Sequence, residues 1–217
     1  MATSTMINWE NVHGQSANFQ KNKPFKFTFI EDFFEKKFYK KLYDTYPKID
    51  ETWKIGSDHS KYQFLKFWNN YSSANQVVEK HEYDSKFSQE WNEFKEYAHS
   101  NEFIDNFAKF SGVKVSRLKH FHFMAYKKGG FQLPHIHDVG PTTLIMMLYF
   151  SKNWQKGDPG GTYMTTDLDE SKIIFEPYNL DNSLAIFHDG PKAAHGTRYI
   201  LKDVTRQAIQ ITLEGYH

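Results

Sequence analysis

The spacing of hydrophobic residues changes part-way along the chain. From about residue 30 to residue 112 the spacing is mostly three or four, which predicts helices, and from Val113 onward it is two, which predicts strands. No internal repeat, low-complexity segment or linker divides the sequence. We therefore expect a single domain over residues 1–217, with mainly helical support in about 1–112 and a β-sheet core in about 113–217.

Three helices are predicted in the first part. In the first of them, Phe34, Phe38 and Leu42 recur every four residues. Asp32 is the expected N-terminal cap of this helix, and Pro47 is the expected stop. The other two helices are expected at residues 88–100 and 101–112. The stretch 51–75 between the first and second helices is polar and stays unassigned.

Short strands fill the second part. Turn sequences rich in Gly, Pro, Asp and Asn separate them, and no helical pattern lies between them. This pattern is typical of antiparallel sheets that close as a sandwich or jelly roll. The expected fold class is α+β, a double-stranded β-helix (jelly roll) in the C-terminal half buttressed by the N-terminal helices. The strands are predicted at residues 113–126, 142–150, 162–166, 172–176, 183–188 and 205–213.

Charge and composition exclude several classes of function. Lys and Arg number 27 against 26 for Asp and Glu, with no block of one sign, so neither a nucleic-acid partner nor a membrane surface is expected. No apolar run is long enough for a signal peptide or a membrane span, so we expect a cytoplasmic protein. Because the chain has no cysteine, any metal ligand must be His, Asp or Glu.

Histidines cluster in the second part of the sequence. His135 and His137 are two residues apart, so on a strand they would share one face and direct two imidazoles to one point. Taken alone, such a pair fits a metal site about as well as it fits ordinary polar residues. His120 and His122 are expected to be hydrogen-bonded interior or pocket-lining residues, and His188 to lie at a pocket rim or in solvent.

From Tyr126 to Leu213 the sequence closely resembles the 2-oxoglutarate- and Fe(II)-dependent oxygenases of the prolyl-hydroxylase type, in particular the hypoxia-sensing branch. The resemblance rests on an ordered series of motifs that ends with a distal His195 and with Arg206 eleven residues later. The preceding motifs are AYKKGG, PHIHD, LYFSKNW, PGGTYM and IIFEPYN.

The resemblance implies a metal site and a cosubstrate site. Fe(II) would be held by His135, by a second ligand close after it and by His195, which leaves positions open for 2-oxoglutarate and dioxygen. Arg206 would meet the distal carboxylate of 2-oxoglutarate, since a guanidinium binds a carboxylate through two hydrogen bonds. Tyr149 would donate its hydroxyl to the same carboxylate, and Tyr126 would line the pocket near the metal.

The second ligand departs from the family pattern. The family has His-x-Asp, whereas this chain has His135-Ile136-His137 with Asp138 one place late. Either three histidines form the site, or a one-residue bulge lets Asp138 reach the metal in place of His137. Strand geometry favours His137, and counting back from Tyr149 favours Asp138. A changed activity, or loss of the iron chemistry, is a third reading.

The expected reaction is hydroxylation of an aliphatic C–H bond, with succinate and CO2 as co-products. Related enzymes act on prolyl side chains, free amino acids and other small molecules, so a small-molecule or peptidyl substrate is expected. Segment 53–64 is a candidate lid or substrate loop because of its irregular pattern. Trp154 and Phe187 are expected to serve packing. The sequence does not predict the oligomeric state.

Competing interpretations remain at this stage. Arg206 alone would also fit a surface ion pair, and Arg198 is its competitor for the cosubstrate. A cupin-like enzyme would use His135, His137 and His195 for metal chemistry without 2-oxoglutarate. A metal-free, ligand-binding jelly roll would use the same histidines only as polar residues of a pocket.

Overall fold

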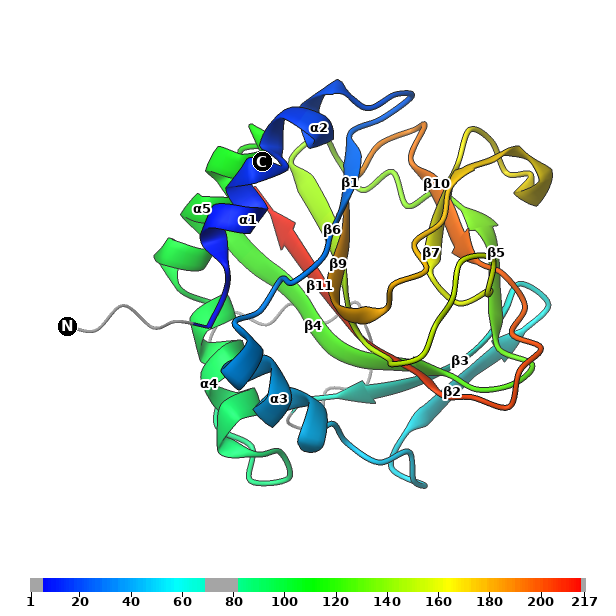
Figure 1. Cartoon of the computed structure of the whole chain (residues 1–217). Coiled ribbons are helices and arrows are strands. Elements are labelled where there is room, and N and C mark those ends of the chain that lie inside the picture. The colour runs from blue at the N-terminus through cyan, green and yellow to red at the C-terminus, as the bar shows by residue number, and fades with distance from the viewer. Residues whose placement is uncertain (1–5, 69–81, 216–217) are drawn as a thin grey trace.

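A computed structural model of the chain describes residues 6–68 and 82–215. A strongly curled antiparallel sheet forms its centre, and helices cover one outer face of this sheet (Figure 1). The helices are α1 (Trp9–Gly14), α2 (Ser16–Lys21), α3 (Lys36–Asp44), α4 (Gln89–Ala98) and α5 (Asn101–Ser111), with a short 3-10 turn at Glu170–Lys172.

Within the described residues the sheet has eleven strands. The first seven are β1 (Phe27–Ile30), β2 (Lys54–Asp58), β3 (Lys61–Phe67), β4 (Arg117–Tyr126), β5 (Phe131–His135), β6 (Thr143–Phe150) and β7 (Thr162–Thr165). The others are β8 (Ile173–Phe175), β9 (Asp181–His188), β10 (Ala194–Thr197) and β11 (Arg206–Glu214).

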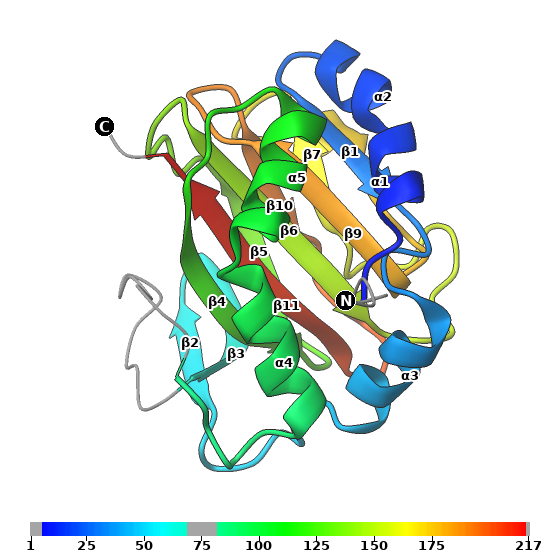
Figure 2. The same cartoon turned by 90° about the vertical axis from the view of Figure 1, so that its left-hand side faces the viewer.

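The strand order explains the roll. Strands β1, β9, β6, β11 and β4 lie side by side, and β3 continues from β4 into β5, β10, β7 and β8. The sheet curls so that this second set lies behind the first set as seen from α4 and α5 (Figure 2). The expected α+β class with a jelly-roll core is therefore confirmed.

Strand β6 shows why the roll is stable. Every residue of β6 is buried, because each of its faces meets a different core. Leu144, Met146 and Leu148 pack into the core between sheet and helices, whereas Met147 and Tyr149 face the inside of the roll. Burying apolar surface on both faces stabilises the strand without any polar alternation.

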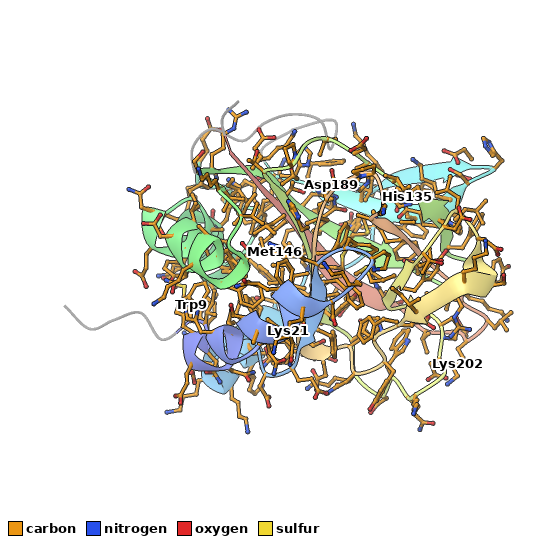
Figure 3. The ribbon with its side chains drawn as sticks, turned by 90° about the horizontal axis from the view of Figure 1, so that it is seen from above. Trp9, Lys21, His135, Met146, Asp189 and Lys202 are labelled. Carbon is orange, nitrogen blue, oxygen red and sulfur yellow. The ribbon has the colours of Figure 1, made fainter. Side chains whose placement is uncertain are left out.

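The two sides of the broad sheet serve different purposes. In Figure 3, Met146 lies between Trp9 of helix α1 and His135 on the far side of the sheet. On β11, Ile209 and Ile211 face the helices, whereas Ala208 and the buried Arg206 lie on the other face. The helical layer therefore supports the sheet, and the inside of the roll is left for a site.

The predicted start of the first helix is wrong. Helix α3 begins at Lys36 with Glu35 as its cap residue, and Asp32 instead has a left-handed φ of 49°. The amides of Phe33 and Phe34 donate to the backbone and side-chain oxygens of Asn182, each at 2.9 Å. Because those amides are committed to a distant strand, the helix cannot start before them.

The first half of the chain is not only helical. Strands β1, β2 and β3 lie in it, and β3 pairs with both β4 and β5 inside the sheet. Segment 53–64 is thus mostly an ordered β2–β3 hairpin and not an irregular loop. Its pattern misled because β3 buries the polar Gln63 beside hydrophobic residues. Part of the unassigned stretch 51–75 lies outside the described residues.

In the described part of the chain, none of the helices has the length and apolar character needed to cross a lipid bilayer.

Candidate metal centre and cosubstrate pocket

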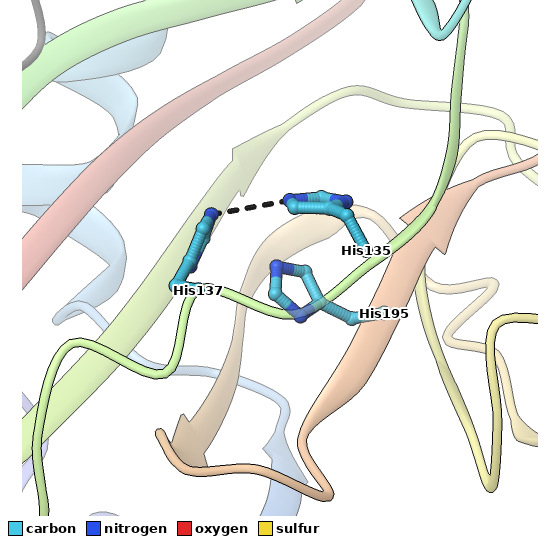
Figure 4. A group of neighbouring side chains, drawn as sticks. All are labelled: His135, His137 and His195. Carbon is cyan, nitrogen blue, oxygen red and sulfur yellow. Dashed lines mark hydrogen bonds between the residues drawn. The ribbon is translucent and has the colours of Figure 1, made fainter.

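Three histidines meet at one end of the roll. Strand β5 ends at His135, and His195 is its direct antiparallel partner on β10, with the two rings 4.2 Å apart. His137 follows in the turn after β5 and faces the same point (Figure 4). One ligand nitrogen from each ring lies within 4.8 Å of the others.

Backbone carbonyls set the orientation of two of these rings. Nδ1 of His135 lies 3.1 Å from the carbonyl oxygen of Leu133, and Nδ1 of His195 lies 2.8 Å from that of Ala193. A carbonyl only accepts, so each Nδ1 must carry the hydrogen and each Nε2 must hold a free lone pair. This outer-shell pattern is the one that orients metal-binding histidines in proteins.

The spacing fits a metal ion. Nε2 of His135 and Nε2 of His137 are 3.1 Å apart. Two nitrogens about 2.1 Å from one ion and at right angles to each other would be about 3.0 Å apart. Burial lowers the pKa of His137 to about 4 and that of His195 well below its ordinary value. Both rings are therefore neutral at pH 7, as ligands must be.

Asp138 lies outside this cluster. His137 and Asp138 are both exposed, and Asp138 has a left-handed φ of 47°. The structure therefore brings His137, and not Asp138, to His135 and His195.

Arg206 is the most deeply buried cation on the inner face of the roll. It is fully buried at the start of β11, where Nε donates to the carbonyl oxygen of Gly160 at 3.0 Å and Nη2 to Oγ1 of Thr162 at 3.3 Å. The rings of Tyr126 and Tyr149 lie 5.0 and 4.9 Å from the guanidinium carbon. Nη1 is buried and has no hydrogen-bond partner among the residues that the structure describes. A buried charge without a counter-ion is costly, which suits a site that receives an anion.

Tyr149 is held in place by the backbone. Its hydroxyl oxygen accepts the amide hydrogen of Thr162 at 2.8 Å, which leaves its own proton free to donate to a ligand. Gly160 and Gly161 precede Thr162. Of these two, Gly161 is sterically required, since a Cβ there would collide with Pro177. Tyr126 donates its hydroxyl to the side-chain oxygens of Gln63 and Gln132, at 2.9 and 3.1 Å.

A cavity of about 240 Å³ extends from the histidine cluster toward Arg206, which lies just behind its wall and does not line it. The three histidines line it together with Tyr126 and Thr162, which contact Arg206. Strand β3 of the hairpin contributes Lys61, Gln63 and Leu65, and the sheet contributes His122 and Gln210. None of the lining residues, all of which belong to the described part of the chain, is acidic.

The remaining sequence candidates lie apart from this centre. Arg198 pairs with Glu176 at 2.7 Å, and His188 lies 2.7 Å from the carbonyl oxygen of Pro141. Trp154 donates its ring N–H to the carbonyl oxygen of Pro159.

Two other sequence candidates do face the site. Phe187 lines the cavity and its ring lies 4.4 Å from that of His195, so it packs directly beside the cluster. His122 is a buried lining residue, as expected, and burial lowers its pKa to about 3. His120 is half-buried. Sequence reasoning missed Gln63, Gln132 and Thr162, because nothing in their local pattern marks a pocket.

Comparison with known proteins supports the fold. No protein-family model matches the chain, and no curated protein matches it in sequence. A prolyl-4-hydroxylase of Pseudomonas putida superposes with a TM-score of 0.63 at 11% identity, covering 95% of this chain and 100% of that one.

Two further solved structures superpose over a similar span. A prolyl hydroxylase of Trichoplax adhaerens, in complex with a peptide fragment of the hypoxia-inducible-factor oxygen degradation domain, has a TM-score of 0.58 at 13% identity, covering 95% and 88%. A non-heme alpha-ketoglutarate-dependent carbocyclase from nogalamycin biosynthesis has a TM-score of 0.60 at 12% identity, covering 95% and 85%. The prolyl-hydroxylase-like fold predicted from the sequence is thus confirmed.

Proposed function

We propose that this protein is an Fe(II)- and 2-oxoglutarate-dependent dioxygenase. One observation carries the proposal: a cluster of three imidazoles lines a cavity whose wall residues Tyr126 and Thr162 contact the fully buried guanidinium of Arg206, which has no acidic partner among the described residues. The first feature suits a divalent metal, and the second suits the carboxylate of a cosubstrate. The fold, shared with oxygenases of this class, agrees with both features.

The metal would be held by His135, His137 and His195. Nitrogen ligands of this kind suit Fe(II), and three of them on one side leave positions for a bidentate 2-oxo acid and dioxygen. Because no ligand carries a negative charge, the metal would keep its full double charge, which favours the binding of an anionic cosubstrate.

Arg206 would bind the distal carboxylate of 2-oxoglutarate. The guanidinium is fully buried, with the rings of Tyr126 and Tyr149 within 5.0 Å of its carbon, so little side-chain entropy would be lost on binding. The free hydroxyl proton of Tyr149 would donate to the same carboxylate. Nη1 of Arg206 would gain the partner that it lacks among the described residues.

When bound, Fe(II) and 2-oxoglutarate supply the oxidising chemistry: dioxygen is consumed, 2-oxoglutarate becomes succinate and CO2, and one oxygen atom enters a C–H bond. The chain's own residues bind, orient and exclude water. We place the substrate, a small molecule or a peptidyl side chain, against the neutral wall that His122 and Gln210 form. The cytoplasmic location stays a prediction from the sequence.

Anaerobic calorimetry tests this proposal. Wild-type protein loaded with Fe(II) should bind 2-oxoglutarate, and the metal-free protein should bind it far more weakly. Arg206→Met should reduce this affinity by about 100-fold or more, because it removes one partner of a buried ion pair. Arg198→Met is the matched control, since Arg198 already pairs with Glu176.

The competing functions predict other results. A cupin-like enzyme would bind Fe(II) but would not bind 2-oxoglutarate through Arg206. A metal-free binding module would bind neither ligand. A screen of peptides and metabolites for stimulated succinate release would then identify the substrate and show whether hydroxylation is the outcome.

A further inference from the structure

A buried carboxylate lies beside the turn that carries His137. Asp189 directly follows β9 and is only 2% exposed. Its Oδ2 accepts the amide hydrogen of Val139 at 2.7 Å, whereas its buried Oδ1 has no hydrogen-bond partner among the described residues. The carboxylate of Asp189 therefore anchors the backbone at Val139, fifty residues earlier in the sequence.

Asp189 is itself fixed to the sheet. Its amide donates to the carbonyl oxygen of Thr143 at 3.0 Å, at the point where β9 runs beside β6. The side chain thus has little freedom to follow the turn. Because Asp189 is fixed to the sheet, the position of the sheet sets the position of the turn that is hydrogen-bonded to Asp189.

The backbone has an unusual conformation at Asp138, the residue after His137. Asp138 has a left-handed φ of 47°, which residues other than glycine rarely adopt without support. His137 lines the cavity and belongs to the histidine cluster, whereas the next residue, Asp138, belongs to neither. The hydrogen bond from the Val139 amide to Asp189 supports this backbone conformation.

The charge of Asp189 also disfavours an inward-facing Asp138. Among the described residues no lysine or arginine forms an ion pair with Asp189, so its charge is balanced only by backbone amides. The carboxylate of Asp138 raises the pKa of Asp189, which means that the two charges repel. Turning Asp138 inward would bring both charges into a space with little solvent, which is unfavourable.

We propose that Asp189 is a positioning residue that selects His137 over Asp138 as the side chain presented to the metal. It does so by holding the amide of Val139, two residues after His137, and it touches neither metal nor substrate. The inference rests on the proposed metal centre for its consequence, but the contact with the turn can be tested separately.

The test is a double-mutant cycle with Co(II) as the probe, measured by calorimetry and by visible absorption. In the wild-type background, Asp189→Ala should weaken Co(II) binding by about 10- to 100-fold, the range typical for groups that orient metal ligands. In the His137→Ala background it should change Co(II) binding by less than about 2-fold, because the residue through which it acts is gone. Asp189→Asn, which keeps the shape and one acceptor, should fall between the wild type and Asp189→Ala.

Controls separate positioning from a general loss of structure. Asp105→Ala removes an exposed carboxylate of α5 and should leave Co(II) binding unchanged. Equal losses from Asp189→Ala in both backgrounds, or no loss in the wild-type background, would overturn the inference. If wild-type protein binds no Co(II), the proposed metal centre is wrong. Hydrogen exchange at the Val139 amide then decides the inference: faster exchange in Asp189→Ala supports the anchor, and unchanged exchange refutes it.

Discussion

His135 and His195 are direct partners across the β5–β10 pair, with their rings 4.2 Å apart although 60 residues separate them in the chain. Backbone pairing therefore fixes both imidazoles. His137 lies beyond the strand, in a turn, so its position depends on other contacts. The sheet thus positions His135 and His195, whereas the turn positions His137. Substitutions in the sheet and in the turn are therefore expected to have different effects.

The turn histidine is expected to bind metal and its neighbour is not. His137→Ala should weaken Fe(II) or Co(II) binding by about 10- to 100-fold, because one of three nitrogens is lost. Asp138→Ala should change the affinity by less than about 2-fold, since this side chain lies outside the cluster of three histidines. Anaerobic titration of both variants measures the difference. The opposite ranking would support the bulged arrangement with Asp138 as ligand.

Gly196 keeps β10 close to its neighbours. A Cβ at this position would lie 2.6 Å from the backbone oxygen of Gln132, a distance that forces β10 away from β5. Gly196→Ala should therefore destabilise the protein by about 1–3 kcal/mol and weaken metal binding through His195. Thermal unfolding and Co(II) titration report the two effects. Gly14→Ala is the control, because a Cβ there would meet nothing within 4 Å; equal behaviour of the two variants would contradict this account.

Tyr149 has both a structural and a ligand-binding task. Tyr149→Phe would leave the buried amide of Thr162 without its acceptor, which should lower the free energy of unfolding by about 1–3 kcal/mol. It should also weaken 2-oxoglutarate binding by about 10-fold, because one hydrogen bond to the distal carboxylate is lost. Denaturant unfolding and anaerobic calorimetry measure these effects. Tyr178→Phe, at an exposed position, should show neither.

Lys95 destabilises the fold in a pH-dependent way. It is fully buried on α4, its ammonium lies 5.2 Å from the Trp68 ring, and within residues 6–68 and 82–215 it has no hydrogen-bond partner. Burial lowers its pKa from 10.5 to about 8, against the opposing effect of Glu82 and Asp84. Between pH 8 and 10.5 the unfolded chain thus binds more protons than the folded protein, so stability rises with pH across this window.

Lys95→Met should accordingly raise the melting temperature most below about pH 8. The gain should shrink as the pH approaches 10.5, where unfolded wild-type protein also loses this proton. Melting curves of both proteins from pH 7 to pH 10.5 measure the effect. A gain that does not change with pH would show that the pKa of Lys95 is the same in the folded and the unfolded protein, so that burial does not lower it.

The sequence by itself determined the long strands and the chemistry they carry. Strands β4, β6 and β11 bury most of their residues and extend over eight to ten positions, so their own hydrophobic pattern identified them. Arg206 and Ala208 lie on one face of β11 and Ile209 on the other, as strict alternation of side chains along a strand requires. The His-x-His motif likewise pointed to His135 and His137 from local spacing alone.

Only the tertiary structure decided the parts that depend on distant partners. Strands β5 and β10 are short and polar, so neighbouring strands rather than their own pattern stabilise them, yet they carry His135 and His195. The β2–β3 hairpin became part of the cavity for the same reason. The local sequence pattern could not decide between His137 and Asp138. The backbone after His137 is held by the hydrogen bond from the Val139 amide to Asp189. A contact between residues fifty positions apart leaves no periodic pattern in the sequence.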